Sequence, residues 1–156
     1  MISEFQIIVR LTLSVILSGF VGLERQWHRR TAGLRTHILV CLGSCLIMLT
    51  SLHVFDIYKN LTTLDPTRIA AGVITGIGFL GAGAIINQRE GIKGLTTAAS
   101  IWVVSGIGLA IGCGFYTAAI FTTLLTLITL FLLRYIEGMM FGKTQDSDKG
   151  GENNGV

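Results

Sequence analysis

The chain has 156 residues, of which 51% are hydrophobic and only 13% are charged, and its mean hydropathy is +0.67. Soluble domains usually carry about a quarter charged residues, and a short soluble fold would leave much of this apolar surface in water, so the composition favours a membrane protein. The net charge is only +3 and the basic residues are spread between apolar runs, which argues against a nucleic-acid-binding protein.

Five apolar stretches follow one another, at about 5–23, 37–55, 69–87, 95–112 and 115–135. Each is close to the ~20 residues that a helix needs to cross ~30 Å of hydrocarbon. The sequence therefore predicts an all-α membrane protein, with five transmembrane helices in one domain over residues 1–141. The first stretch is interpreted as a span rather than a signal peptide, because no basic residue precedes it.

The basic residues indicate the orientation of these helices. Residues 24–36 hold four of them, residues 88–94 hold two and the segment from 134 onward holds three, which is nine of the twelve in the chain. Five spans would place these three segments on one side, and their excess of arginine and lysine marks that side as cytoplasmic. The N-terminus is then outside, and the polar residues 142–156 are expected to form a disordered cytoplasmic tail.

The third stretch contains GVITGIGFLGAG (72–83), which includes the spacing G-x-G-x-x-G. A dinucleotide-binding loop would need a strand before the glycines and an acidic residue about twenty positions later. Here Asp65-Pro66 starts a helix and the apolar run continues through the glycines, so the match is interpreted as accidental. On a helical wheel the small residues share one side, which is expected to pack on protein, while the aliphatic side with Val73 and Ile77 is expected to face lipid.

A partial repeat extends this pattern. VITGIGF (73–79) and VVSGIGL (103–109) share Val, Gly, Ile and Gly, as two copies of one packing surface would, or simply as glycine-rich membrane helices often do. The glycines expected to serve helix packing, within the chain or in a homo-oligomer, are Gly72, Gly76, Gly78, Gly81, Gly83, Gly106 and Gly108.

Polar residues mark the first two spans. Arg10 lies inside the first span and is expected to snorkel to the outer interface, with the bundle interior as the alternative. The short loop after that span should close a helical hairpin and bring Glu24 near Arg35 and His37. This group is interpreted as a charge pair between helix ends or, alternatively, as a hydrated cation or proton site. The candidate residues there are Glu24, Arg25, Arg35, Thr36 and His37.

The other polar candidates have simple structural interpretations. Asp65 and Arg68 are expected to form a helix cap and a surface ion pair, Glu90 is solvated in the third loop, and Thr96 and Thr97 can accept from the first N–H groups of the fourth span. No nucleophile, base and orienting group fall together, so neither enzyme activity nor a cofactor is expected. Magnesium prefers oxygen ligands, carboxylates among them, and the sequence names no set of metal ligands, so Mg²⁺ is considered only as an effector.

Four long motifs occur in order: AGLRTHILVCLGS (32–44), DPTRIAAGVITGIGFLGAGAI (65–85), REGIKGLTTAASIW (89–102) and GIGLAIGCGFY (106–116). Together with GLERQW (22–27), they resemble the MgtC/SapB family of bacterial inner-membrane proteins over roughly residues 10–130. In that family a loop glutamate falls on Glu90, an asparagine position holds Thr96 here and a cysteine position holds Val103. Trp102 ends the third motif. Members of the MgtC type also carry a folded cytoplasmic C-terminal domain, where this chain has a short polar tail.

The resemblance implies a protein linked to growth under magnesium limitation. It also implies control of the F-type ATP synthase by contact in the membrane. We therefore expect a regulatory or adaptor protein of the bacterial inner membrane that acts in magnesium homeostasis and low-magnesium stress adaptation through membrane partners. The alternative is a transporter of magnesium, another divalent cation or a small solute.

Overall fold

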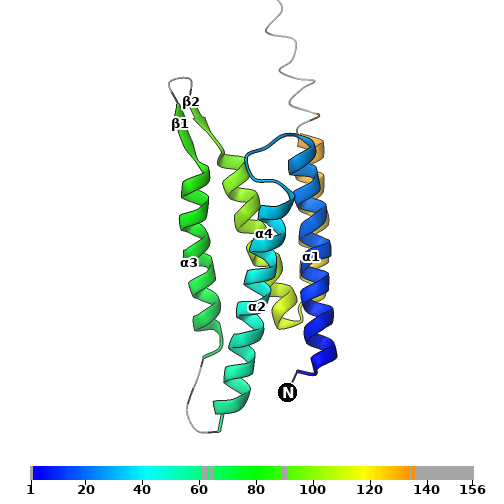
Figure 1. Ribbon diagram of the computed structural model, residues 1–156, viewed down its shortest axis with the longest axis vertical. Helices are drawn as coiled ribbons and strands as arrows, with labels where there is room; N and C mark the ends of the chain where they lie inside the picture. Colours follow the sequence, from blue (N-terminus) through cyan, green and yellow to red (C-terminus); the bar gives the residue numbers. More distant parts are fainter. Residues whose placement is uncertain (1, 61–62, 64, 89–90, 134, 136–156) are drawn as a thin grey trace, which may run out of the picture.

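Five helices lie side by side in the computed structural model (Figure 1), which describes residues 2–60, 63, 65–88, 91–133 and 135. The helices are α1 (Glu4–Trp27), α2 (Leu34–Tyr58), α3 (Thr67–Ala84), α4 (Leu95–Cys113) and α5 (Tyr116–Ile128), and a π-helix, η1 (Thr129–Leu133), continues α5. Within these residues α1 to α4 are long and apolar enough to cross a membrane, and α5 is a shorter apolar helix. The predicted all-α fold with five helices is confirmed.

Local sequence explains several helix ends. Ser3 Oγ accepts the N–H of Gln6 (3.3 Å) and the Gln6 side chain accepts the N–H of Ser3 (3.2 Å), which forms a capping box at the start of α1. Gly94 and Gly114 flank α4 with φ of 95° and 89°, in the left-handed region that glycine adopts without a steric penalty.

A short hairpin joins α3 to α4. Its strands, β1 (Ile86–Gln88) and β2 (Gly91–Lys93), pair antiparallel with Ile86 opposite Lys93, and they extend beyond the helix ends in Figure 1. The prediction that the third helix continues to residue 87 was wrong. The chain leaves the helix at Ile85, which has extended dihedrals (φ −91°, ψ 121°), and the β-branched Ile85 suits that conformation.

The centre of the bundle is the contact between α2 and α4. The buried hydrophobic residues of the main core are Val21, Cys41, Cys45, Leu49, Val104, Ile107, Ile111 and Ala119. A Cβ on Gly108 would overlap the carbonyl oxygen of Cys41, and a Cβ on Gly112 would lie 2.6 Å from Cβ of Met48. The two glycines therefore allow the backbones of α4 and α2 to approach closely, as small residues do between membrane helices.

The two sides of α3 are only partly as predicted. Of the aliphatic residues expected to face lipid, Val73 and Ile77 are buried (8% exposed each), whereas Ile74 and Leu80 are 36% and 51% exposed. A Cβ added at Gly81 would lie 3.7 Å from Cβ of Ala98, an ordinary packing distance. Added Cβ atoms would meet nothing within 4 Å at Gly72, Gly76, Gly78 and Gly83, nor at Gly106 in α4. Branched side chains bring more atoms into contact with α4 than glycines do, so α3 packs on the bundle through Val73 and Ile77.

Arg10 lies inside the bundle, as the alternative interpretation expected, and is only 9% exposed. Its Nη1 donates to the carbonyl oxygen of Gly112 (2.7 Å) at the end of α4, where a cation complements the negative end of the helix dipole.

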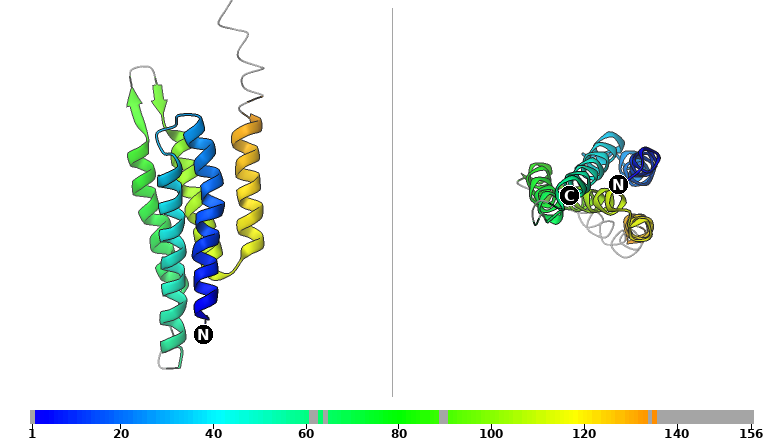
Figure 2. Two further views of the ribbon diagram at one scale, coloured as in Figure 1. Left: turned by 45° about the vertical axis from the view of Figure 1, so that its right-hand side comes forward. Right: turned by 90° about the horizontal axis from the view of Figure 1, so that it is seen from below.

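The loop between α1 and α2 and the β1–β2 hairpin lie at the same end of the bundle, which we call the hairpin end (Figure 2). The N-terminus and the connection from α4 to α5 lie at the opposite end, which we call the N-terminal end. This alternation agrees with the number and order of the spans expected from the sequence.

Gly108→Ala should lower the free energy of unfolding by about 1–3 kcal/mol, because overpacking forces helices apart. Gly76→Ala is the matched control, since its Cβ would meet nothing within 4 Å and alanine is the better helix former by about 0.5–1 kcal/mol. Reversible unfolding in detergent micelles would measure both. Equal stability of Gly108→Ala and the wild type would contradict the importance of the α2–α4 contact.

Candidate functional site

Five buried polar residues gather at the hairpin end of the bundle. This polar cluster consists of Glu24, Arg25, His37, Thr97 and Ser100, and each is at most 5% exposed. The residues come from α1, α2 and α4. The short loop brings α2 against α1, and Gly22 permits this, because a Cβ there would lie 2.8 Å from Cα of Leu34. Helix α4 then contributes its first two turns.

His37 connects α2 to α4. Its Nδ1 lies 2.8 Å from the carbonyl oxygen of Gly33, which can only accept, so Nδ1 carries a proton. Its Nε2 lies 3.0 Å from Oγ of Ser100, which is also 2.8 Å from the carbonyl oxygen of Thr97. Neutral His37 accepts from the Ser100 hydroxyl, whereas protonated His37 donates to it while Ser100 donates to Thr97. The hydrogen bonds thus accommodate both protonation states of His37.

Arg25 and Glu24 supply the charges of the polar cluster. Nη2 of Arg25 donates to Oγ1 of Thr97 (2.6 Å), and the Thr31 hydroxyl lies 3.5 Å from the same oxygen. Oε1 of Glu24 lies 2.9 Å from Nδ1 of His28, one turn later on α1. A basic and an acidic side chain are therefore held beside the His37 hydrogen bonds, in surroundings where charges interact strongly.

The sequence identified only part of this arrangement. The structure places Arg35 and Thr36 on the exposed side of α2, outside the polar cluster. The two helix ends are instead joined by Oε1 of Gln26, which accepts the N–H of Leu34 (3.2 Å). Thr97 was expected to cap α4, but the N-cap is Gly94 and the Thr97 side chain binds Arg25. The sequence did contain a signal that Thr97 and Ser100 belong to the polar cluster, because they are two hydroxyl residues one helical turn apart in an apolar span.

A cavity of about 300 Å³ between α4 and α5 adjoins the polar cluster through Ser100. It is lined by Thr96 and Val103 of α4 and by three hydroxyls, those of Thr122 and Thr126 on α5 and Thr129 at the start of η1. The resemblance described above implies an asparagine at the position of Thr96 and a cysteine at that of Val103, and both positions line this cavity. It reaches from the first turn of α4 to Val103, about 10 Å further along the helix at 1.5 Å per residue.

The remaining candidates lie elsewhere. Asp65 and Arg68 are exposed at the N-terminal end, and Trp102 is half exposed on α4. Oδ1 of Asp65 accepts from the backbone N–H (2.8 Å) and the hydroxyl (2.6 Å) of Thr67, the first residue of α3, although the N-cap of that helix is Pro66. Glu90 lies outside the described residues.

The described residues contain no group of three or more His, Cys, Asp or Glu side chains that could hold a metal ion. Glu24 is the carboxylate of the polar cluster, and its Oε1 lies 2.9 Å from Nδ1 of His28, which competes with a cation for that oxygen. The arrangement supports hydrogen bonding and proton exchange at His37.

Thr97→Val should lower the free energy of unfolding by about 1.5–3 kcal/mol, since buried Arg25 loses a hydrogen bond to a neutral acceptor. Thr96→Val is the control at the neighbouring exposed position and should change stability by less than about 0.5 kcal/mol. Chemical unfolding in micelles compares the two. If both variants unfold at the same denaturant concentration as the wild type, the stabilising hydrogen bond between Arg25 and Thr97 is refuted.

Hydrogen bonds from the side chain and backbone of Thr67, with a smaller contribution from the charge of Arg68, lower the pKa of Asp65. The stabilisation of the α3 start by the carboxylate is therefore complete above the ordinary aspartate pKa and is lost as the pH falls through the lowered pKa. Thr67→Val should raise the pKa, and Thr63→Val should not. Carboxyl ¹³C NMR titration measures this, and equal values in both variants would refute it.

The chain is similar to several bacterial proteins over most of its length. The family described as the MgtC family matches residues 11–139. YhiD of Escherichia coli (strain K12) is 48% identical over 132 residues, which is 83% of this chain and 60% of YhiD. Protein MgtC of Salmonella typhimurium is 40% identical over 131 residues, covering 83% of this chain and 53% of MgtC. An uncharacterized protein of Haemophilus influenzae is 37% identical over 141 residues, covering 87% and 59%.

This chain thus spans a little over half the length of these relatives. No solved structure matches it. The family match covers most of α1, all of α2 to α5, the polar cluster and the cavity beside it, and the chain belongs to the MgtC family.

Proposed function

We propose that this protein is a regulatory or adaptor protein of the bacterial inner membrane. It acts in magnesium homeostasis and in adaptation to low magnesium, through contacts with other membrane proteins. The MgtC family membership supports the link to magnesium. The Escherichia coli relative YhiD, whose full name is putative magnesium transporter YhiD, supports it as well. The family resemblance nominates the F-type ATP synthase as one such partner, and Mg²⁺ is the effector to which the protein responds.

The observation that carries this proposal is the distribution of buried charge. Among the described residues, Glu24, Arg25 and His37 are buried at the hairpin end and Arg10 at the N-terminal end. Between them, α2 and α4 are in close contact at Gly108. A path for a divalent cation would need polar ligands near the middle of the membrane. The buried polar side chains between the two ends of the described bundle include the uncharged Ser18 and Ser44, which donate to carbonyl oxygens of their own helices. This arrangement favours a regulatory role over transport.

The open side of α3 supports contacts with other chains. Gly72, Gly76 and Gly83 lie on a helix at the edge of the bundle, and their positions have room for an approaching helix (Figure 2). Small residues are the usual contact surface between membrane helices. We propose that this side of α3 receives a helix of a second copy in a homo-oligomer or of another membrane protein.

The transport alternative is favoured by one feature, the cavity between α4 and α5. Its threonine hydroxyls offer oxygen atoms about halfway along α4. Under this alternative the cavity would bind a partly dehydrated cation or a small solute. The polar cluster would form the entrance to the cavity at the hairpin end.

Gly76→Leu should abolish function without unfolding the protein. A Cβ there meets no atom of the chain within 4 Å, so a leucine side chain extends into the open space and blocks an approaching helix. The measurement is growth of a gene-deleted strain in low-magnesium medium, together with crosslinking of the protein to its neighbours in native membranes. Gly43→Leu on α2 is the matched control, because a Cβ at Gly43 also meets nothing within 4 Å. Full complementation and unchanged crosslinking by Gly76→Leu would refute contact through this side of α3.

The same proposal predicts no Mg²⁺ flux through purified protein in liposomes. Magnesium flux that is lost in Thr126→Val, which removes a hydroxyl from the cavity, and retained in Thr117→Val, which lies outside it, would establish the transport alternative. Either result is interpretable because both substitutions are close to isosteric.

A further inference from the structure

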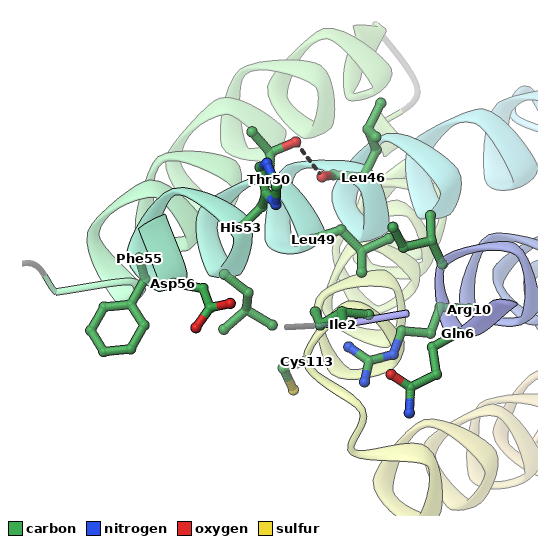
Figure 3. A pocket seen from close by; sticks show the side chains of 12 residues that line it. Ile2, Gln6, Arg10, Leu46, Leu49, Thr50, His53, Phe55, Asp56 and Cys113 are labelled. Atoms are coloured by element: carbon green, nitrogen blue, oxygen red, sulfur yellow. Dashed lines mark hydrogen bonds between the residues drawn. The ribbon is translucent and has the colours of Figure 1, made fainter. Parts of the chain in front are cut away.

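A second cavity, of about 590 Å³, lies at the N-terminal end of the bundle (Figure 3). It is enclosed by the start of α1, the last four turns of α2 and the end of α4. Its volume falls within the about 300–1,000 Å³ typical of small-molecule sites. Its apolar lining residues are Ile2, Ile7, Leu46, Leu49, Leu52 and Phe55.

Arg10 is the buried cation of this cavity. Its Nη1 donates to the carbonyl oxygen of Gly112 (2.7 Å) and its Nε donates to the hydroxyl of Tyr116 (3.1 Å), so both hydrogen-bond partners are neutral. Among the described residues no carboxylate forms an ion pair with it. A guanidinium has five N–H donors and a fixed charge, and burying that charge without an anion is costly in a membrane.

The opposite wall of the cavity does not neutralise Arg10. Asp56 lies there, but its carboxylate is paired with Nζ of Lys59 at 2.5 Å, one turn later on α2. His53, Gln6, Thr50 and Cys113 complete the polar lining. Among the described charged groups that face the cavity, none therefore neutralises Arg10. The cavity combines this cation with apolar walls, and it suits an anionic group attached to a hydrocarbon chain.

The depth of Arg10 identifies the source of such a group. Helical side chains lean toward the N-terminus of their helix, so Arg10 extends from the second turn of α1 toward the membrane surface at the N-terminal end. Its guanidinium meets α4 in that helix's last turn, close to where the chain turns into α5. A membrane helix of this length ends near the edge of the hydrocarbon. Phospholipid phosphates lie at that depth.

We propose that this cavity binds a phospholipid of the leaflet at the N-terminal end, with its phosphate against Arg10 and an acyl chain along Leu46, Leu49 and Phe55. The bound lipid supplies the anion that Arg10 lacks and fills the space between α1 and α2. This site is independent of the regulatory role proposed above.

Cys113 provides a direct test, since it lines the cavity and is exposed, whereas Cys41 and Cys45 are buried. In delipidated protein in detergent, added phosphatidylglycerol should slow alkylation of Cys113 by N-ethylmaleimide. The slowing should be about tenfold near ten times the lipid Kd, because only unoccupied protein reacts. The matched control is Cys113→Ser with Thr117→Cys, an exposed thiol outside the cavity, whose alkylation rate should not change.

Two further ligands separate the sources of binding. Diacylglycerol with the same acyl chains should protect Cys113 much less, and inorganic phosphate alone should not protect it. Equal protection by diacylglycerol would overturn the role of the phosphate, and protection by inorganic phosphate would make this a site for a soluble anion. Arg10→Lys should retain part of the phosphatidylglycerol protection, and Arg10→Gln should lose it.

Because Arg10 also binds the end of α4, Arg10→Gln could disturb the fold. A second measurement avoids this difficulty. Thr50→Trp places an indole in the cavity from an exposed position on α2, and native mass spectrometry should then detect less retained phospholipid than on the wild type. The proposal would be overturned if Thr50→Trp retained as much phospholipid as the wild type and phosphatidylglycerol did not protect Cys113 from alkylation.

Discussion

The close approach of α4 to α2 determines the arrangement of the other helices. At Gly108 the two backbones are so near that even a methyl group would overlap the carbonyl oxygen of Cys41, and Gly112 repeats this contact one turn later against Met48. Water does not drive helices together within a bilayer, so such packing contacts are a main source of association. Helix α4 is thereby held at the centre, and α3 and α5 pack on its two sides (Figure 2).

The same contact sets the position of the polar residues along the bundle. Ser100 lies about two turns before Gly108 on α4, and His37 lies about one turn before Cys41 on α2. Their side chains meet at 3.0 Å because the glycines align the helices at this height. At the other end the carbonyl of Gly112 receives Arg10. The polar cluster at the hairpin end and the phospholipid cavity at the N-terminal end are both consequences of one helix contact.

Glycines of similar sequence context have different roles in this molecule. VITGIGF in α3 and VVSGIGL in α4 align Gly78 with Gly108, yet only Gly108 packs against another helix. Ile77 and Ile107, which also align, are both buried. What the two copies of the repeat share is therefore a buried isoleucine at the same position. Within the repeat, close glycine packing occurs in α4 at Gly108, while Gly76 and Gly78 of α3 remain accessible to another chain, as a protein that acts through membrane partners would require.

The sequence by itself determined the class of fold and the order of the helices, because long apolar runs and the charges between them reflect the cost of placing polar groups in hydrocarbon. It also placed His37, Glu24 and Arg25 at one helical hairpin. Only the tertiary structure decided which glycines pack, that Arg10 turns inward to Gly112, and that Thr97 and Ser100 complete the polar cluster. These outcomes depend on the rotation and height of each helix against its neighbours. That geometry arises from contacts between residues far apart in the chain, and periodicity within a single helix does not encode it.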